Sequence, residues 1–179
     1  MIEVKLEEID TGAVSCGVSF LDIAEHFSSH SHLALLDTRG VAGYSFLAFR
    51  PFLTGDFSVV KRALHTWRLS DVPGCGRPPF LGGGIGYFSY DFGRRFETIP
   101  NRAVDELELP DCYFCFYNAV FILDPGGRIF LSSFDPGVAG AVTREEVLAE
   151  LLRVTPGCYA GSRIAPFAFG SNLDAETAP

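Results

Sequence analysis

The segment 112–134 constrains the fold most, because it holds two apolar runs joined by a strong turn signal. The first run, 112–123, is aromatic and aliphatic, and the second, 128–134, follows the tetrad Asp124-Pro-Gly-Gly. Turn residues between two such runs are typical of an antiparallel hairpin. The chain also contains 17 Phe, 6 Tyr and 19 Gly. Aromatic side chains favour pleated surfaces and Gly permits tight turns, so we predict a strand-rich interior around this hairpin.

Three further segments have the pattern of strands. Residues 2–9 alternate apolar and charged side chains, as expected for a strand with one face in water. Residues 32–38 and 44–49 are apolar, aromatic-rich runs separated by a loop that contains two glycines. We predict that these two runs pair as neighbouring strands.

Three short helices are expected between the strands. Ser19 and Asp22 have the spacing of a capping box, and apolar side chains recur at helical spacing after them. A second apolar stripe covers 59–67 and ends at the Pro- and Gly-rich cluster 71–79. Thr143 and Glu146 open a third helix, in which four apolar side chains are predicted to share one face: Val147, Leu148, Leu151 and Leu152. Helices and antiparallel strands together predict an α+β domain.

Composition and charge bound the function. With 179 residues and 47% apolar side chains, the chain is long enough to bury the core of one domain. It carries 22 acidic and 14 basic residues, for a net charge of −8, which disfavours nucleic acid as a partner because the basic residues are scattered. The first ten residues lack the basic and apolar regions of a targeting signal, and no apolar run approaches the length of a membrane helix. We therefore expect a cytoplasmic protein with no membrane partner.

The five cysteines are predicted to be reduced thiols, because they are odd in number and dispersed: Cys16, Cys75, Cys112, Cys115 and Cys158. Cys112 and Cys115 have the C-x-x-C spacing of redox and metal motifs. Residues i and i+3 of a strand point to opposite faces, however, so their sulfurs should diverge. We interpret both as core cysteines.

Three other clusters could carry chemistry but have simpler explanations. His26, His30 and His32 could hold zinc, yet no cysteine pair stands nearby, so we expect surface or partly buried histidines and no metal site. The glycines at 82–84 and 86 suggest a phosphate loop, but no Lys-Ser/Thr follows them. A strand packed closely against another layer explains them better. The Arg94-Arg95 pair could bind an anion, or it could form local ion pairs with Asp91 and Glu97.

Three stretches in order carry a resemblance to a known family. They are Leu33-Ala-Leu-Leu-Asp-Thr running into Tyr44-Ser-Phe-Leu-Ala-Phe-Arg-Pro-Phe, then Phe80-Leu-Gly-Gly-Gly-Ile-Gly-Tyr-Phe-Ser-Tyr-Asp, then Leu109-Pro-Asp leading to Phe116-Tyr-Asn-Ala-Val-Phe-Ile-Leu-Asp. Together they resemble the N-terminal region of aminodeoxychorismate synthase component I and of the anthranilate synthase large subunit. The Gly-Tyr-Phe-Ser-Tyr-Asp block with Gly93-Arg94-Arg95 favours the aminodeoxychorismate branch, and thus p-aminobenzoate and folate biosynthesis over tryptophan biosynthesis.

The resemblance implies a fold, a reaction and partners. Relatives have stacked antiparallel sheets with helices outside, and they aminate chorismate with ammonia from a glutamine amidotransferase subunit. Their chorismate and Mg²⁺ residues lie in a C-terminal chorismate-binding domain. We therefore expect a component I N-terminal-like domain over 1–155, with 156–179 as a linker toward that domain. The chain by itself should be inactive, with no catalytic residue, metal or cofactor of its own.

One functional feature of the family falls within this region. Its amino-acid pocket, which receives tryptophan in some relatives, uses a Leu-Leu-Glu-Ser stretch that matches 35–38 here. The resemblance therefore implies a ligand pocket at five residues: Leu36, Asp37, Thr38, Tyr44 and Ser45. A carboxylate can pair with a ligand ammonium and a hydroxyl can hydrogen-bond it. Gly43 stands where relatives commonly have Arg, and Asp37 has a simpler interpretation as a solvated carboxylate at a strand end.

Two alternatives to part of an enzyme remain open at this stage. The chain could be a free-standing module that binds an amino acid or regulates a homologue, or it could be a non-functional truncation. A self-sufficient module should be monomeric and expose little apolar surface, whereas an orphan half should expose the surface meant for its partner.

Overall fold

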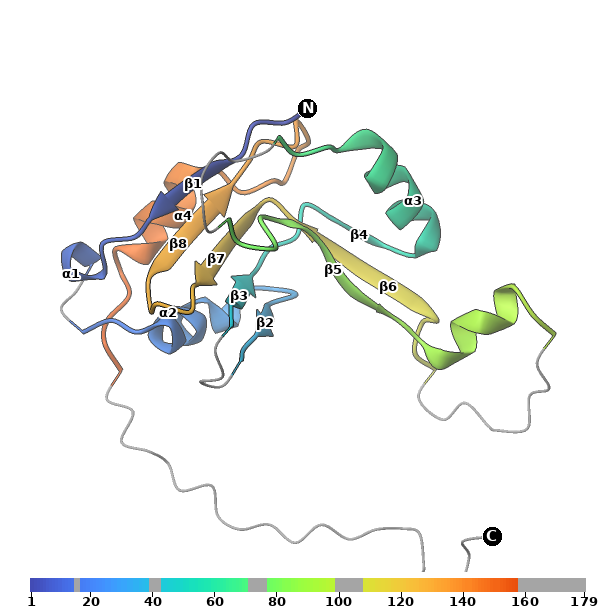
Figure 1. The fold of residues 1–179 in the computed structure, drawn as a ribbon, viewed down its shortest axis with the longest axis horizontal. Coiled ribbons are helices and arrows are strands. Elements are labelled where there is room, and N and C mark those ends of the chain that lie inside the picture. Colours follow the sequence, from blue (N-terminus) through green and yellow to red (C-terminus); the bar gives the residue numbers. More distant parts are fainter. Residues whose placement is uncertain (15–16, 39–42, 71–76, 99–107, 158–179) are drawn as a thin grey trace, which may run out of the picture.

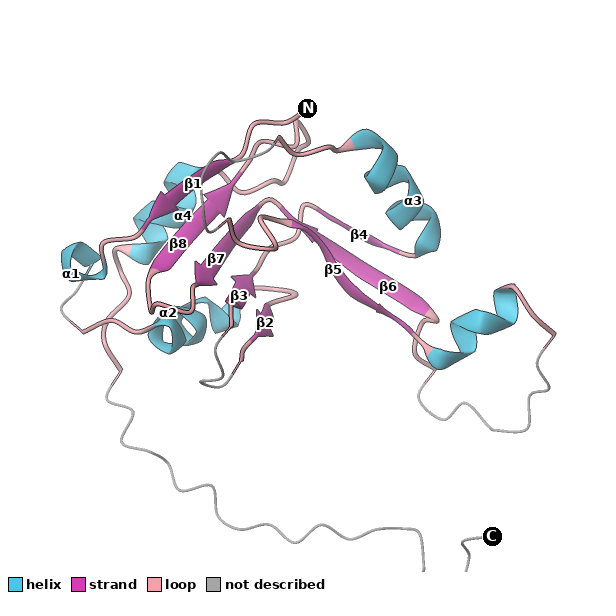
Figure 2. Ribbon diagram, in the orientation of Figure 1, coloured by secondary structure: helices cyan, strands magenta, loops and turns pink. Residues whose placement is uncertain are grey.

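The computed structural model describes residues 1–14, 17–38, 43–70, 77–98 and 108–157. Within these residues the chain forms two antiparallel sheets with short helices around them (Figures 1 and 2). The large sheet has the order β1 (Lys5–Glu8), β8 (Ile129–Ser133), β7 (Ala119–Leu123), β3 (Ser45–Ala48) and β2 (Ala34–Leu36). The small sheet has the order β4 (Leu53–Gly55), β6 (Cys112–Tyr117) and β5 (Gly83–Phe88).

The helices are short, and the longest of the described ones has ten residues. They are α1 (Thr11–Val14), α2 (Phe20–His26), the 3₁₀ helix η1 (Phe27–Ser29), α3 (Phe57–Thr66), the 3₁₀ helix η2 (Tyr90–Arg95) and α4 (Arg144–Leu151). No helix of the described segments is long and apolar enough to cross a membrane.

Side-chain alternation in the large sheet produces two apolar faces. Leu47 and Phe121 lie on the face that is covered by α2, η1 and α4. Phe46 and Ile122 lie on the opposite face, in a cluster that also contains side chains of the small sheet. The predicted hairpin is confirmed as β7 and β8, and the predicted pairing of 32–38 with 44–49 is confirmed as β2 and β3. The predicted strand over 2–9 is shorter, because Ile2 instead bridges to Leu69.

The helix starts follow their predicted caps. Ser19 caps α2 and Thr143 caps α4, each with a reciprocal capping box. Val147 and Leu151 are buried against the large sheet, as predicted. The prediction for Leu152 is wrong, because the helix ends one residue earlier and the Leu152 side chain is 65% exposed.

The apolar run 112–123 is not one strand, as the sequence suggested, but two strands in different sheets. The chain leaves β6 and enters β7 at Asn118, whose side chain is fully buried. Its Nδ2 donates to the carbonyl oxygens of Phe134 (2.9 Å) and Val142 (2.8 Å). Its Oδ1 accepts no hydrogen bond from any described residue. Asn118 therefore ties the crossing between the sheets to the end of β8 and to the loop before α4.

The glycine-rich segment leads into and forms β5, an edge strand of the small sheet, and at Gly82 it packs closely against another layer, as predicted, since a Cβ there would lie 2.7 Å from the Phe134 ring. A Cβ at Gly86 would lie 2.2 Å from the Tyr113 carbonyl oxygen, and one at Gly84 would lie 3.0 Å from the Phe116 ring. The glycines therefore make room for the backbone and the aromatic rings of the neighbouring strand β6. The opposite edge of this sheet is β4, and α3 covers one face through Val60 and Ala63.

The predicted α+β class with antiparallel sheets is confirmed. Three of the five cysteines, Cys16, Cys75 and Cys158, lie outside the described residues, as does nearly all of the predicted linker 156–179. The domain boundary at residue 155 therefore stays a prediction.

We expect Gly86→Ala to lower the free energy of unfolding by about 2 kcal/mol, because the added methyl group meets backbone atoms of β6 that cannot turn away. Gly12→Ala is the matched control, since its Cβ would approach only the flexible Asp10 carboxylate at 3.2 Å. Urea denaturation of both variants measures the difference. Equal stability of the two variants would contradict the close approach of β5 to β6.

Asp22 predicts a pH dependence of stability. Hydrogen bonds from the Ser19 side chain and backbone, opposed by burial and aided by the Gly157 N–H, lower the pKa of Asp22 below its ordinary value of 3.8. A lowered folded-state pKa contributes stability above the unfolded pKa and loses it as pH falls through the folded pKa. We expect Asp22→Asn to cost about 1–2 kcal/mol at pH 7. The difference in free energy of unfolding between this variant and the parent protein should become smaller below about pH 4. Urea denaturation at each pH measures it.

The control for this prediction is Glu25→Gln, an exposed carboxylate on the same helix with no hydrogen bond to a described residue. It should leave both the stability at pH 7 and its pH dependence unchanged. A gap between the parent and Asp22→Asn that stays constant from pH 7 to pH 3 would contradict the ionised state of Asp22.

Candidate functional site

The five residues of the predicted amino-acid pocket come together where β2 ends and β3 begins. Leu36 is the last residue of β2, and Asp37 and Thr38 follow it directly. Tyr44 precedes β3, and Ser45 is its first residue. The antiparallel pairing of Leu36 with Phe46 brings the two ends of the intervening loop side by side. Residues 39–42 of this loop lie outside the described residues.

Ser45 connects these residues through its hydroxyl group. Its side chain is 1% exposed, and its Oγ donates to Oδ1 of Asp37 at 2.9 Å. The same Oγ accepts the Thr38 N–H at 3.2 Å and lies 3.3 Å from the Thr38 hydroxyl. Asp37 itself is exposed, so one side of its carboxylate is held by Ser45 and the rest is open to solvent. A carboxylate held in this way can still accept hydrogen bonds from a cationic ligand group.

Apolar side chains lie beside this polar turn. Leu36, Tyr44 and Phe46 occupy one face of the large sheet, because Leu36 pairs with Phe46 and Tyr44 is two residues before it. The Tyr44 and Phe46 rings stack at 6.3 Å, and the Phe80 ring meets Phe46 edge-on at 5.7 Å. Leu36 is 50% exposed. The turn thus offers a carboxylate and a hydroxyl next to an apolar wall, which is the chemistry expected of a pocket for an amino acid.

The small sheet presents an apolar face toward the same side. Its register puts Ile85, Tyr87 and Tyr113 on the face that also carries Cys115 and Tyr117. Tyr117 packs with Phe46 in the cluster that joins the two sheets. We call the five partly exposed side chains on these two facing surfaces the inner face: Leu36, Tyr44, Ile85, Tyr87 and Tyr113. Figure 1 shows that the far part of the small sheet extends away from the large sheet, with η2 at its end.

Two tyrosines of the small sheet hold the segment before β2. The Tyr117 hydroxyl donates to the His32 carbonyl oxygen at 2.6 Å, and the Tyr113 hydroxyl lies 3.2 Å from His32 Nε2. Burial raises the pKa of Tyr117, so its hydroxyl stays protonated and remains a donor. No local sequence pattern indicates these contacts, because the partners are more than 80 residues apart.

The C-x-x-C pair behaves as predicted. Cys112 and Cys115 are buried free thiols. Cys112 packs with α3 on one face of β6, and Cys115 packs in the cluster between the sheets on the other face. Burial raises the pKa of the Cys112 thiol, so it is a poor nucleophile and a poor metal ligand at neutral pH.

The histidine and arginine clusters have local partners. His30 Nε2 lies 2.5 Å from Glu150 Oε1, and His26 Nε2 lies 4.0 Å from the same oxygen. Among the residues that the structure describes, no three His, Cys, Asp or Glu side chains are grouped so that they could hold a metal ion. Arg94 pairs with Asp91 at 2.6 Å, as the ion-pair interpretation predicted. Arg95 lies over the Phe92 ring.

Comparisons with known proteins agree with the motifs. The aminodeoxychorismate synthase component 1 of Bacillus subtilis is 31% identical over 126 residues, which is 59% of this chain and 27% of that protein. The anthranilate synthase component 1 of Streptomyces coelicolor is 30% identical over 139 residues, covering 70% of this chain and 26% of that protein. The aminodeoxychorismate synthase component 1 of Klebsiella aerogenes is 48% identical over 58 residues, or 32% of this chain and 13% of that protein. No protein-family model matches the chain.

These relatives belong to one class of protein, component 1 of aminodeoxychorismate and anthranilate synthases. The chain is similar to part of such a protein. The particular resemblance predicted from the three motifs, to aminodeoxychorismate synthase component I and anthranilate synthase component I, is confirmed. The matched segments span only about an eighth to a quarter of these three relatives, from 13% to 27% of their length.

Proposed function

We propose that this chain is the N-terminal, non-catalytic portion of a chorismate-aminating component I, and that it needs a chorismate-binding domain for activity. The similarity to two kinds of component 1 supports the class. The observation that carries the rest of the proposal is the inner face, which leaves apolar side chains of both sheets open to solvent. Such a face is typical of a surface that packs against another domain.

The arrangement of the two sheets supports this role. Tyr87 is 40% exposed and Leu36 is 50% exposed, although their cross-strand partners, Tyr113 and Phe46, belong to or pack against the cluster that joins the sheets. Figure 1 shows the small sheet extending away from the large sheet, and partly exposed apolar side chains on both sheets are what a further layer would cover. A chorismate-binding domain seated there would extend the buried cluster and cover these side chains.

The resemblance supplies the remaining parts of the proposal. Chorismate and Mg²⁺ bind to the chorismate-binding domain, and a glutamine amidotransferase subunit delivers ammonia to it. This chain contributes structural support and no catalytic group. The Gly93-Arg94-Arg95 motif favours p-aminobenzoate and folate biosynthesis in the cytoplasm. Anthranilate and tryptophan biosynthesis is the second branch.

We expect a mixture of this chain with the separately expressed chorismate-binding domain of a relative to consume chorismate in the presence of ammonium and Mg²⁺, while neither part does so alone. Tyr87→Asp should weaken the association by about tenfold, because it places a charge in the apolar interface. Titration of chorismate consumption against this chain measures the effect, and product analysis separates p-aminobenzoate precursors from anthranilate.

Leu152→Asp is the matched control, because Leu152 is also an exposed apolar residue but lies at the end of α4, outside the inner face. It should leave the association unchanged. The proposal fails if the mixture is inactive, or if both variants weaken the association equally.

A second candidate function, a module that binds an amino acid, is favoured by the Ser45 network. The buried hydroxyl of Ser45 orients the exposed Asp37 carboxylate beside the apolar wall of Leu36 and Tyr44. A free amino acid with a large apolar side chain, such as tryptophan, offers an ammonium group for the carboxylate and an apolar body for the wall.

We expect tryptophan to bind the chain in isothermal titration calorimetry if this second function is correct. Asp37→Ala should weaken the binding by about tenfold or more, because a charge-assisted hydrogen bond contributes roughly 1.5–3 kcal/mol. Glu25→Ala, an exposed carboxylate on α2, is the control and should bind like the parent. Absence of heat with the parent chain excludes the module while leaving the first proposal intact.

A further inference from the structure

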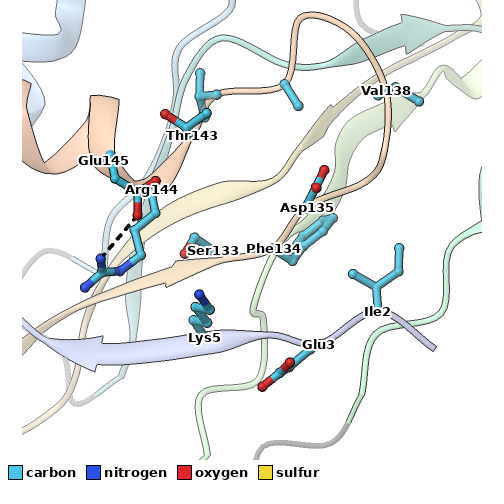
Figure 3. Close-up of a pocket in the computed structure, with 12 residues that line it drawn as sticks. Ile2, Glu3, Lys5, Ser133, Phe134, Asp135, Val138, Thr143, Arg144 and Glu145 are labelled. Carbon is cyan, nitrogen blue, oxygen red and sulfur yellow. Dashed lines mark ion pairs between the residues drawn. The ribbon is translucent and has the colours of Figure 1, made fainter.

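A cavity of about 620 Å³ opens between β1, the end of β8 and the loop that leads into α4 (Figure 3). Its volume is within the range of small-molecule sites. It contains none of the residues of the amino-acid pocket or of the inner face, so it is a separate feature of the molecule. The motifs of the sequence do not point to it.

Two polar side chains of neighbouring strands meet at this cavity. Lys5 and Ser133 are directly opposite each other in the pairing of β1 with β8, so their side chains lie on the same face of the large sheet. Figure 3 shows the Lys5 side chain extending from β1 toward Ser133. The two residues together therefore offer an ammonium group and a hydroxyl group at one point of the wall.

The Ser133 hydroxyl is available to a ligand in the cavity. The residue is only 6% exposed, and its hydroxyl makes no hydrogen bond with any residue that the structure describes. The neighbouring serine, Ser132, instead donates to the Leu81 carbonyl oxygen on the other face of the sheet. The only buried side-chain polar atom without a partner among the described residues is Asn118 Oδ1, so the Ser133 hydroxyl opens into the cavity, where a ligand can reach it.

Lys5 is the cation of the cavity that remains available. Arg144 also lines it, but its guanidinium is already paired with Glu7 and Glu145. Lys5 forms no ion pair with any other described residue. A ligand that approaches the cavity therefore meets one available positive charge beside one available hydroxyl.

The remaining wall is apolar or carries acidic groups. Ile2, Phe134, Val138 and Val142 supply apolar surface. Glu3, Asp135 and Glu145 also line the cavity; Asp135 accepts the Gly137 N–H, and Glu145 faces Arg144 at 3.6 Å. These acidic groups disfavour any anion, and they disfavour a multiply charged one such as phosphate more strongly than a single carboxylate, whose one charge Lys5 can offset.

We propose that this cavity binds a small monocarboxylate with an apolar body, whose carboxylate accepts hydrogen bonds from Lys5 Nζ and Ser133 Oγ while its body packs against Phe134 and Val142. This inference is independent of the function proposed above. The carboxylate accepts a hydrogen bond from the hydroxyl that opens into the cavity, and the charge-assisted bond from Lys5 supplies the preference for an anion.

The test uses 3-phenylpropanoate as the probe and its neutral amide, 3-phenylpropanamide, as the matched ligand without charge. Titration of the full chain is followed by amide chemical shifts in NMR, which report both affinity and location. We expect saturable binding of the carboxylate with a dissociation constant of about 1 mM or lower, with the largest shifts near residues 5 and 133. The amide should bind roughly tenfold more weakly.

Lys5→Gln should weaken binding of the carboxylate about tenfold and leave binding of the amide unchanged. The matched control is Lys61→Gln, because the chain has two lysines and Lys61 lies on α3. Ser133→Ala should weaken binding of the carboxylate probe about threefold or more. The proposal is wrong if no saturable binding occurs, if carboxylate and amide bind equally, or if Lys61→Gln has the effect of Lys5→Gln.

Discussion

The hydrogen bonds of Asn118 are the constraint on which the arrangement of the two sheets depends. The side chain is 2% exposed and sits where β6 of the small sheet continues into β7 of the large sheet. Its side-chain Nδ2 donates to the carbonyl oxygens of Phe134 and Val142, and the backbone carbonyl oxygen of Asn118 accepts the Phe134 N–H at 3.0 Å. An unpaired buried amide costs about 1–3 kcal/mol, so the chain cannot cross between the sheets in another register without losing stability.

This crossing also determines what the molecule exposes. Because β6 and β7 belong to different sheets on either side of Asn118, the pairing of β5 with β6 leaves Ile85 at the edge of the cluster that joins the sheets and Tyr87 beyond it. The glycines of β5 permit close approach to β6 and supply no side chains that could cover the aromatic residues. An apolar inner face and a polar turn at Ser45 then lie on the same side of the molecule. The proposed docking of a chorismate-binding domain rests on that juxtaposition.

Much of the local structure could be predicted, because local signals control it. The capping boxes at Ser19 and Thr143 and the turn after Leu123 act over a few residues, and they appear where expected. The single strand expected over 112–123 was wrong because apolar periodicity does not show which sheet a residue joins. The polar residue Asn118 within that apolar run was the one sign that the run could be divided into two strands. Leu152 was misplaced because a helix end depends on its last hydrogen bonds, which periodicity does not report.

The sequence by itself determined the α+β class, the opposite faces of Cys112 and Cys115, and the resemblance to component I. Each of these depends on side-chain alternation, helix caps or motifs, which involve residues close together in the sequence. Only the tertiary structure decided which distant groups meet. The Ser45 network, the contacts of His32 with Tyr113 and Tyr117, and the pairing of Lys5 with Ser133 join segments that strand register brings together. Register depends on burial and on the crossing at Asn118, so no local pattern could reveal these contacts.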